Sequence, residues 1–308
     1  EGMIGVMVEG RYPILARKGN LNNDIGLPLT LLKLQGEPFA VVEMGANHPG
    51  EIAYLSGIAR PDLVVLNNVG AAHLEGFGDL AGVARAKGEI ISGLSGDGLV
   101  ILNGDDPWSG FWRQLAGDRR VLSFGLGVEN QVRTVPDSLD TVWVEDGFRT
   151  TFSLHSPFGG AEIQLALAGQ HNVMNALAAA AATLAVGMSP EEVVRGLGRI
   201  TPVSGRLQTK TALSGARVID DTYNANPDSV GAAIDVLSSA PGVRWLVLGD
   251  LAELGPTGLE LHRNLGERAK QAGIQYLWSL GSASEAASIA FGPGGRHFTT
   301  REALIAAL

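Results

Sequence analysis

The sequence contains no cysteine among its 308 residues. This absence excludes a disulfide framework, thiolate metal sites and a cysteine nucleophile. It is also compatible with a reducing compartment, so we expect a cytoplasmic protein.

Positive charge is scarce as well. The sequence has 23 lysines and arginines against 32 acidic residues, so the formal net charge is −9. An acidic balance argues against non-specific binding to nucleic acid. A few placed arginines and a metal ion can still bind a small anionic substrate. We therefore expect no nucleic-acid partner, while a small anionic ligand remains possible.

Long apolar runs are also missing. No run reaches the roughly 18 residues that a membrane span needs, and the longest candidate, residues 178–186, is alanine-rich and typical of a packed helix. The composition is 45% hydrophobic and 18% charged over 308 residues, which is enough for two domains with sizeable cores. We expect a monomer without a membrane span.

Signals that start or stop a helix are absent at both ends of the sequence. Residues 1–5 look like the middle of a helix with neither a cap nor a signal peptide, and residues 304–308 lie inside an apolar helical pattern. We therefore expect both ends to lack neighbouring segments.

The phosphate-binding pattern G-x-x-x-x-G-K-[ST] is missing from the sequence too. Taken alone, this absence argues against ATP.

Short apolar runs rich in β-branched residues alternate with helical stretches at residues 39–44, 62–67 and 99–103. Their hydrophobicity is continuous, which is typical of strands buried on both faces of a parallel sheet. Residues 142–155 differ, because two alternating runs flank Asp146-Gly147 and predict an antiparallel hairpin. The fold class is therefore α/β, a central and mostly parallel sheet with an appended antiparallel β element.

The second half of the chain adds two helices and then a new strand–helix series. A long helix is predicted from His171 to Val186, and a shorter one begins after the N-cap Ser189. Residues 201–206 break the pattern, and strands resume at 217–220, 245–248 and 276–280. We place the domain boundary there, giving a central domain at 1–205 and a Rossmann-like C-terminal domain at 206–308.

Three side chains are candidates for a metal–phosphate site. Glu43 and His73 follow two predicted strands, so both are expected at the carboxyl edge of the sheet, where open α/β folds bind ligands. Lys87 lies on the next helix. The pair of imidazole and carboxylate leaves zinc or manganese open beside magnesium.

Each of these residues has a structural alternative that is favoured when it is considered alone. Glu43 could cap a helix or pair with an arginine, His73 could bond to loop backbone, and Lys87 among alanines is typical of a surface lysine.

Polar segments elsewhere predict ligand contacts. Asn20, Asn22 and Asn23 lie in a loop rich in glycine and amides, for which a plain turn is an equal alternative. Asp221 belongs to the segment 220–228, where a strand meets a helix and nucleotides are often held.

Three more side chains lie at a helix start or beside the domain break. Asn172 and Asn175 open the long helix, and capping explains one of its polar groups but not all of them. Arg206 stands beside the break, where it could bind phosphate or remain solvated.

Taken together, seven stretches in this order resemble the Mur ligase family. They are residues 19–26, 43–51, 71–78, 86–90, 171–176, 220–226 and 249–255. The family has three domains, and the resemblance covers the last two, beginning just after the position of the family's P-loop. The missing P-loop is therefore interpreted as a truncation.

The resemblance implies ATP and Mg²⁺ as cofactors. Glu43 would bind the magnesium that bridges the ATP phosphates, while His73 and Lys87 would serve a second magnesium. In the family this lysine is carbamylated, which turns a cation into an oxygen ligand. A free ammonium beside Mg²⁺ would be repelled, so either the modification exists or Lys87 contacts phosphate.

The resemblance also implies roles for the polar side chains. Asn172 and Asn175 would hold adenine, Asp221 the ribose and Arg206 the phosphates, while Asn20, with Asn22 and Asn23 beside it, would face the UDP-sugar substrate.

The implied reaction is ATP-dependent amide ligation in peptidoglycan precursor synthesis. A UDP-N-acetylmuramoyl-tripeptide would form an acyl phosphate, which D-alanyl-D-alanine then attacks. Alternatives are another Mur-type or folylpolyglutamate-type ligase, or a catalytically silent nucleotide-binding protein. Nothing in the sequence specifies the third peptide residue, lysine or diaminopimelate.

Overall fold

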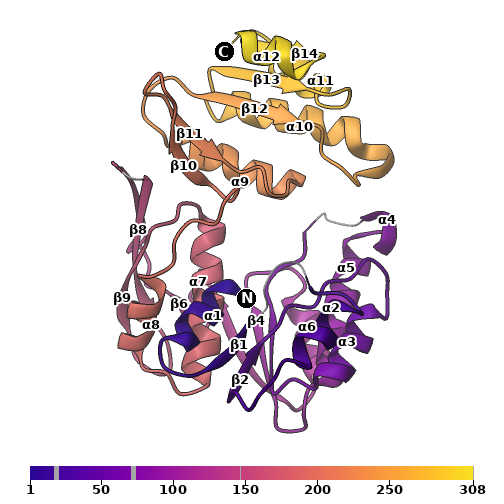
Figure 1. Cartoon of the computed structure of the whole chain (residues 1–308), viewed down its shortest axis with the longest axis vertical. Coiled ribbons are helices and arrows are strands. Elements are labelled where there is room, and N and C mark those ends of the chain that lie inside the picture. Colours follow the sequence, from indigo (N-terminus) through magenta and orange to yellow (C-terminus); the bar gives the residue numbers. More distant parts are fainter. Residues whose placement is uncertain (17–20, 71–73, 146, 308) are drawn as a thin grey trace. The chain divides into compact units, whose positions relative to one another are not determined.

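A computed structural model describes residues 1–16, 21–70, 74–145 and 147–307 of the chain (Figure 1). These residues form two compact units, the first made mainly of Glu1–Val69, Gly76–Val144 and Phe148–Thr201 and the second mainly of Pro202–Leu308. The domain limits 1–205 and 206–308 remain a prediction, because compactness alone does not define a domain.

A seven-stranded sheet is the centre of the first unit. Its strand order is β3-β4-β5-β6-β8-β7, and β9 pairs with β8. The strands β3 to β6 pair in parallel, whereas β6 with β8 and β8 with β9 are antiparallel. The bounds are β3 (Leu63–Leu66), β4 (Leu99–Asn103), β5 (Arg120–Gly125), β6 (Val132–Thr134), β7 (Asp140–Val144), β8 (Gly147–His155) and β9 (Ala161–Leu165). The predicted fold class, with its antiparallel addition, is confirmed.

Helices alternate with the strands along most of the first unit. They are α1 (Gly2–Glu9), α2 (Gly26–Leu31), α3 (Glu51–Ala59), α4 (Leu74–Phe77), α5 (Leu80–Gly88), the 3₁₀ turn η1 (Glu89–Gly93), α6 (Ser109–Ala116), α7 (Gln170–Ala185) and α8 (Pro190–Leu197). Ser189 caps α8 as predicted, because its hydroxyl accepts from Glu192 N at 3.3 Å and Glu192 Oε2 accepts from Ser189 N at 2.7 Å.

The long helix α7 packs against the strands β3 to β6. Its face consists largely of alanine, and the run Ala178–Ala182 is at most 6% exposed. Small side chains let the helix axis approach the sheet closely, and Val173 and Leu177 fill the remaining volume with Phe124 from β5. This is the larger of the hydrophobic cores in the first unit.

The strand predicted at residues 39–44 differs from expectation. β2 (Phe39–Val41) is only three residues long and pairs in parallel with β1 (Ile14–Ala16) in a separate two-stranded sheet. Ala40 is exposed, so β2 is not buried on both faces. A continuous apolar run therefore overstated the burial of this strand.

The second unit contains a hairpin and a three-stranded parallel sheet. β10 (Gln208–Thr211) pairs antiparallel with β11 (Arg217–Asp220), and the parallel sheet has the order β12 (Trp245–Gly249), β13 (Tyr276–Leu280) and β14 (Gly295–Phe298). The strand at 217–220 exists but belongs to the hairpin rather than to the parallel sheet. β10 is polar, which is why the hydrophobic pattern does not reveal it.

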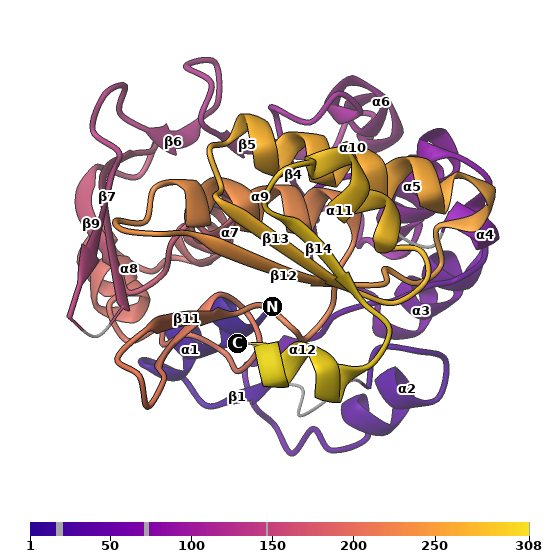
Figure 2. The same cartoon turned by 90° about the horizontal axis from the view of Figure 1, so that it is seen from above.

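Helices cover both faces of this parallel sheet. They are α9 (Pro227–Ser238), the turn η2 (Gly255–Thr257), α10 (Gly258–Gln271), α11 (Glu285–Phe291) and α12 (Arg301–Ala307). Ile234, Leu265 and Phe291 form the core on one face with α9 to α11, while Leu304 of α12 packs on Trp278 from the other face. Figure 2 shows α12 across the strands from α10 and α11. None of the helices in the described ranges is long and apolar enough to cross a membrane.

Candidate functional site

Lys87 reaches the carboxyl end of β3. It lies in the last turn of α5, a helix that is capped by Asp79, whose side chain accepts from Gly82 N at 2.6 Å. The Lys87 Nζ donates to the carbonyl oxygen of Asn68 at 2.5 Å, two residues past the end of β3. The alternative of a solvated surface lysine does not fit this contact, because the amine is directed at the backbone of the sheet edge.

Burial changes the acid–base chemistry of this amine. Desolvation lowers the pKa of Lys87 below its ordinary value, and the negative charge of Asp106 opposes part of that effect. A larger share of the side chain is therefore neutral amine at a given pH than for an exposed lysine. Only the neutral amine has the lone pair needed for nucleophilic chemistry.

Asp106 is a site residue that the sequence reading missed. It follows β4 and is only 6% exposed, yet its carboxylate has two backbone donors. Oδ2 accepts from Val69 N and Oδ1 accepts from Trp108 N, both at 2.8 Å. The available signal was its position, because acidic residues directly after a buried parallel strand lie at the ligand-binding edge.

Asn175 is joined to the same edge through Asn67. Asn67 Nδ2 donates to Asn175 Oδ1 at 2.9 Å, which links the end of β3 to the first turns of α7. Asn67 Oδ1 is buried and has no hydrogen-bond partner among the residues that the structure describes. Asn172 Nδ2 donates to Ala168 O at 2.7 Å, a local bond at the start of α7.

Glu43 is exposed and lies beside Asn22, one of the residues predicted to face substrate. Asn22 Nδ2 donates to Glu43 Oε1 at 3.2 Å, so two predicted site residues meet. Gly45 makes the approach possible, because a Cβ there would lie 2.6 Å from Asn22 Nδ2. Asn23 has a local task, since its Oδ1 accepts from Gly26 N at 2.8 Å at the start of α2.

Two predicted residues, His73 and Asn20, lie outside the described residues. The expected meeting of Glu43, His73 and Lys87 at a metal therefore remains a prediction. Within the described ranges, no group of three or more histidine, aspartate or glutamate side chains is arranged to hold a metal ion.

In the second unit, Arg206 and Asp221 lie on two segments that bond to each other. Leu207 N donates to Asp221 Oδ1 at 3.0 Å, and Tyr223 N donates to Gly205 O at 3.0 Å. The exposed guanidinium of Arg206 lies over the Tyr223 ring, 4.5 Å from its centroid. Stacking holds the arginine while leaving it accessible to an anion.

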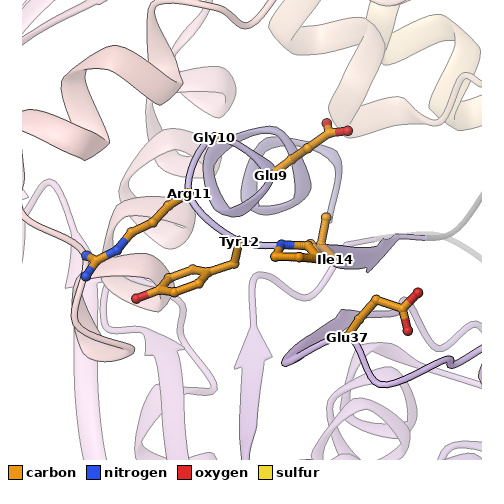
Figure 3. Close-up of a pocket in the computed structure, with 7 residues that line it drawn as sticks. Glu9, Gly10, Arg11, Tyr12, Ile14 and Glu37 are labelled. Atoms are coloured by element: carbon orange, nitrogen blue, oxygen red, sulfur yellow. The ribbon is translucent and has the colours of Figure 1, made fainter.

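A shallow hollow of about 480 Å³ lies away from these residues. It is lined by Glu9–Ile14 and Glu37, at the amino ends of β1 and β2, whereas Glu43 follows the carboxyl end of β2. Figure 3 shows Glu9 and Glu37 on one side and Arg11 and Tyr12 on the other. Parallel sheets bind ligands at the carboxyl edge, so we do not assign the reaction to this hollow.

Two family domains match almost the whole chain. Residues 2–183 match the Mur ligase middle domain, and residues 205–308 match the domain described as "Mur ligase, glutamate ligase domain".

Two curated relatives share one name. UDP-N-acetylmuramoyl-tripeptide–D-alanyl-D-alanine ligase of Escherichia coli (strain K12) is 45% identical over 292 residues, covering 94% of this chain and 63% of that protein. The enzyme of that name from Bacillus subtilis (strain 168) is 37% identical, covering 91% of this chain and 59% of its own length. The chain thus spans less than two thirds of these relatives.

Solved structures agree. MurF from Acinetobacter baumannii matches with a TM-score of 0.90 at 36% identity, over 99% of this chain and 66% of that one. MurF ligase from Thermotoga maritima in complex with ADP matches with a TM-score of 0.85 at 26% identity, over 99% of this chain and 69% of that one.

Proposed function

Because the chain belongs to the Mur ligase family, we propose that the protein is an ATP-dependent amide ligase of peptidoglycan precursor synthesis. Its substrates would be a UDP-N-acetylmuramoyl-tripeptide and D-alanyl-D-alanine, as in the name of its 45% identical Escherichia coli relative. The observation that carries the proposal is the half-buried Lys87, whose amine meets the backbone at the carboxyl edge of the sheet.

The reaction has two steps. The terminal carboxylate of the tripeptide attacks the γ-phosphorus of ATP, and ADP leaves. The amine of D-alanyl-D-alanine then attacks the carbonyl carbon of the resulting acyl phosphate, and phosphate leaves with the formation of the amide. Such chemistry depends on positioning and charge neutralisation more than on covalent catalysis by the protein.

Magnesium ions, when bound, would supply the positive charge that neutralises the phosphates. The donors of this chain fit that use if Lys87 is carbamylated, because Mg²⁺ prefers oxygen ligands. The neutral amine that burial favours is the form that adds to CO₂, forming an N–C bond and releasing a proton. Glu43 and His73 would be the other protein ligands.

Nucleotide-binding roles are proposed for four side chains. Asn172 and Asn175 are proposed to hold adenine, and Asn175 would use its Nδ2 because its Oδ1 already accepts from Asn67. Asp221 would meet the ribose and Arg206 the phosphates, while Asn20, Asn22 and Asn23 would face the UDP-sugar. The ADP complex of the Thermotoga maritima relative supports nucleotide use.

We place the enzyme in the cytoplasm as a monomer that serves cell-wall growth and cell division. ATP and UDP-linked precursors are cytoplasmic, and the sequence has no cysteine that would mark an oxidising compartment.

An acceptor screen tests the substrate. The gene product that contains this sequence is incubated with ATP, Mg²⁺ and the UDP-tripeptide, and ADP release is measured with D-alanyl-D-alanine or with single amino acids. We expect release only with the dipeptide. Turnover driven by single amino acids would favour another Mur-type or folylpolyglutamate-type ligase, and no turnover with any acceptor would favour the silent alternative.

Replacing Lys87 tests the proposed ligand. Lys87→Ala should lower ligase activity by at least about 100-fold, because an oxygen ligand of the metal is removed. Formate or acetate should restore part of that activity by supplying a carboxylate. The matched control is Lys270→Ala, an exposed lysine on α10 whose loss should leave activity unchanged. Full activity of the Lys87 variant without added carboxylate would refute the role.

A further inference from the structure

Two adjacent aspartates after β4 hold different parts of the first unit. Asp105 is exposed and accepts from Leu126 N at 2.5 Å and from Asn130 Nδ2 at 2.6 Å. Asp106 is buried, and its Oδ2 accepts from Val69 N. Of these two aspartates, Asp106 is the one that bonds to the described part of the segment after β3.

The amide that Asp106 binds belongs to the peptide group that Lys87 binds. The carbonyl oxygen of Asn68 and the nitrogen of Val69 are the two ends of one peptide unit. That unit donates its N–H to Asp106 Oδ2 at 2.8 Å and accepts from Lys87 Nζ at 2.5 Å. A peptide unit is planar and rigid, so fixing its N–H also fixes the direction of its carbonyl.

The same connection also holds the helix that carries Lys87. The turn containing Asp106 leads directly into α6, where the buried Trp112 donates from Nε1 to Ala84 O of α5 at 3.0 Å. Gly88 leaves room for the indole ring, since a Cβ there would lie 3.3 Å from Trp112 Cδ1. Trp112 therefore holds the helix that carries Lys87, and Asp106 holds the peptide group that accepts from the lysine.

We propose that Asp106 is a positioning residue that orients the Asn68–Val69 peptide group, and through it the side-chain nitrogen of Lys87. The effect of this orientation on the reaction rests on the proposed function, in which Lys87 is carbamylated. A carbamate on Lys87 retains one N–H, and donation of that N–H to Asn68 O fixes how the carbamate group is turned about the side-chain nitrogen. Asp106 thereby sets the orientation of the carbamate oxygens through the Asn68–Val69 peptide group.

The test compares Asp106→Asn with the matched control Asp105→Asn. The single oxygen of an asparagine can accept from either Trp108 N or Val69 N. Its NH₂ group would then face the remaining N–H, and two donors cannot bond to each other. Carbamate on Lys87 is measured by ¹³C NMR as the protein is titrated with ¹³C-bicarbonate. We expect Asp106→Asn to need roughly tenfold more bicarbonate for half-occupancy, the size of one lost bond to a charged group, and Asp105→Asn to match the wild type.

A second readout does not depend on the carbamate. Competitive labelling of amines with acetic anhydride, read by mass spectrometry, compares Lys87 with the exposed Lys270 in each protein. The Lys87 rate should change several-fold in Asp106→Asn and stay constant in Asp105→Asn. If the wild type shows no carbamate signal, the metal role of Lys87 fails, while the labelling still decides whether Asp106 positions the amine.

Two outcomes would overturn the proposal. One is an unchanged bicarbonate titration and labelling rate in Asp106→Asn, and the other is an equal change in both variants. Should Asp106→Asn not fold by circular dichroism, Asp106→Glu takes its place. It keeps both acceptor oxygens at a shifted position, so it should move the labelling rate in the same direction but less, and a folded Glu variant with no shift also overturns the proposal.

Discussion

Asp220 ties the β10–β11 hairpin to the segment that follows it. Its Oδ2 accepts from Lys210 Nζ at 2.5 Å, and its Oδ1 accepts from Thr222 Oγ1 at 2.7 Å. The bond from Lys210, followed by that from Thr222, lowers the pKa of Asp220 below its ordinary 3.8. The ionised form is therefore favoured in the folded hairpin, and folding is linked to pH at this residue.

Asp220→Asn tests that linkage. A lowered pKa contributes stability that is present above pH 3.8 and lost as the pH falls through the folded-state pKa. The wild type should exceed the variant in unfolding free energy by at most about 1 kcal/mol at pH 7, since Lys210 is half exposed. Urea titrations across the acid range, followed by tryptophan fluorescence, should show this difference shrinking below pH 3.8, and Lys210→Met should remove most of it. A difference independent of pH would contradict the linkage.

At the same scale, only part of the site could be predicted. Glu43 was identified from residue type and strand position, and it does meet Asn22. Asn175 was identified from the polar start of a helix, and Lys87 only through the family resemblance. The role of the Asn68–Val69 peptide group could not be predicted, because every residue has the same backbone atoms and the sequence does not show which of them bind a side chain. Asp106 was missed because its importance depends on a segment 37 residues earlier in the chain.

Among the elements, α10 and α11 cross at a glycine. A Cβ at Gly266 would lie 2.1 Å from Ala287 O and 2.9 Å from Ala287 Cα, so the two helices touch through backbone. Gly258, at the start of α10, has room, since its Cβ would lie 3.5 Å from Leu254 Cβ. A glycine is therefore needed for close helix packing at Gly266 but not at Gly258.

Alanine substitutions separate these two glycines. Gly266→Ala should destabilise the second unit by about 1–3 kcal/mol, because the backbone of α11 must move to admit the methyl group. Gly258→Ala should be neutral or slightly stabilising, because alanine has the higher helix propensity. Both values come from denaturant unfolding followed by circular dichroism. Equal effects of the two substitutions would contradict a close backbone contact between Gly266 and Ala287.

Helices and strands were predicted correctly where the sequence signal lies within the element itself. The helix α8 was found through its capping residues, and β4 and β13 through dense apolar runs, which are properties of a short window. β10 was missed because Gln-Thr-Lys-Thr gains its strand structure only by pairing with β11. The parallel order of the sheets follows from contacts between distant segments and could be predicted only as a class.

On the scale of the whole molecule, the two units have separate hydrophobic cores. Phe152 is 1% exposed in the core of the first unit, and Phe291 is 2% exposed in the core of the second. The two clusters share no residue. Each unit therefore has its own source of stability.

Truncating each phenylalanine should weaken one unit only. Phe152→Ala and Phe291→Ala should each cost about 3–5 kcal/mol from the loss of a buried ring. Amide hydrogen exchange in native conditions should speed up in β4, β5 and β8 for the first variant and in β12 to β14 for the second. Faster exchange in both units from either change would show that they unfold as one.

The buried alanines of α7 restrict how this protein can diverge. At Ala178–Ala182 every side chain is almost completely enclosed, so a larger residue has no free side of the helix to occupy. Glycine and serine are then the mildest single steps, and any gain in size needs a compensating loss on a facing strand. Drift in this segment would proceed through paired substitutions, which would make Ala178–Ala182 one of the slowest-changing parts of the lineage although none of these five residues is proposed to bind a ligand.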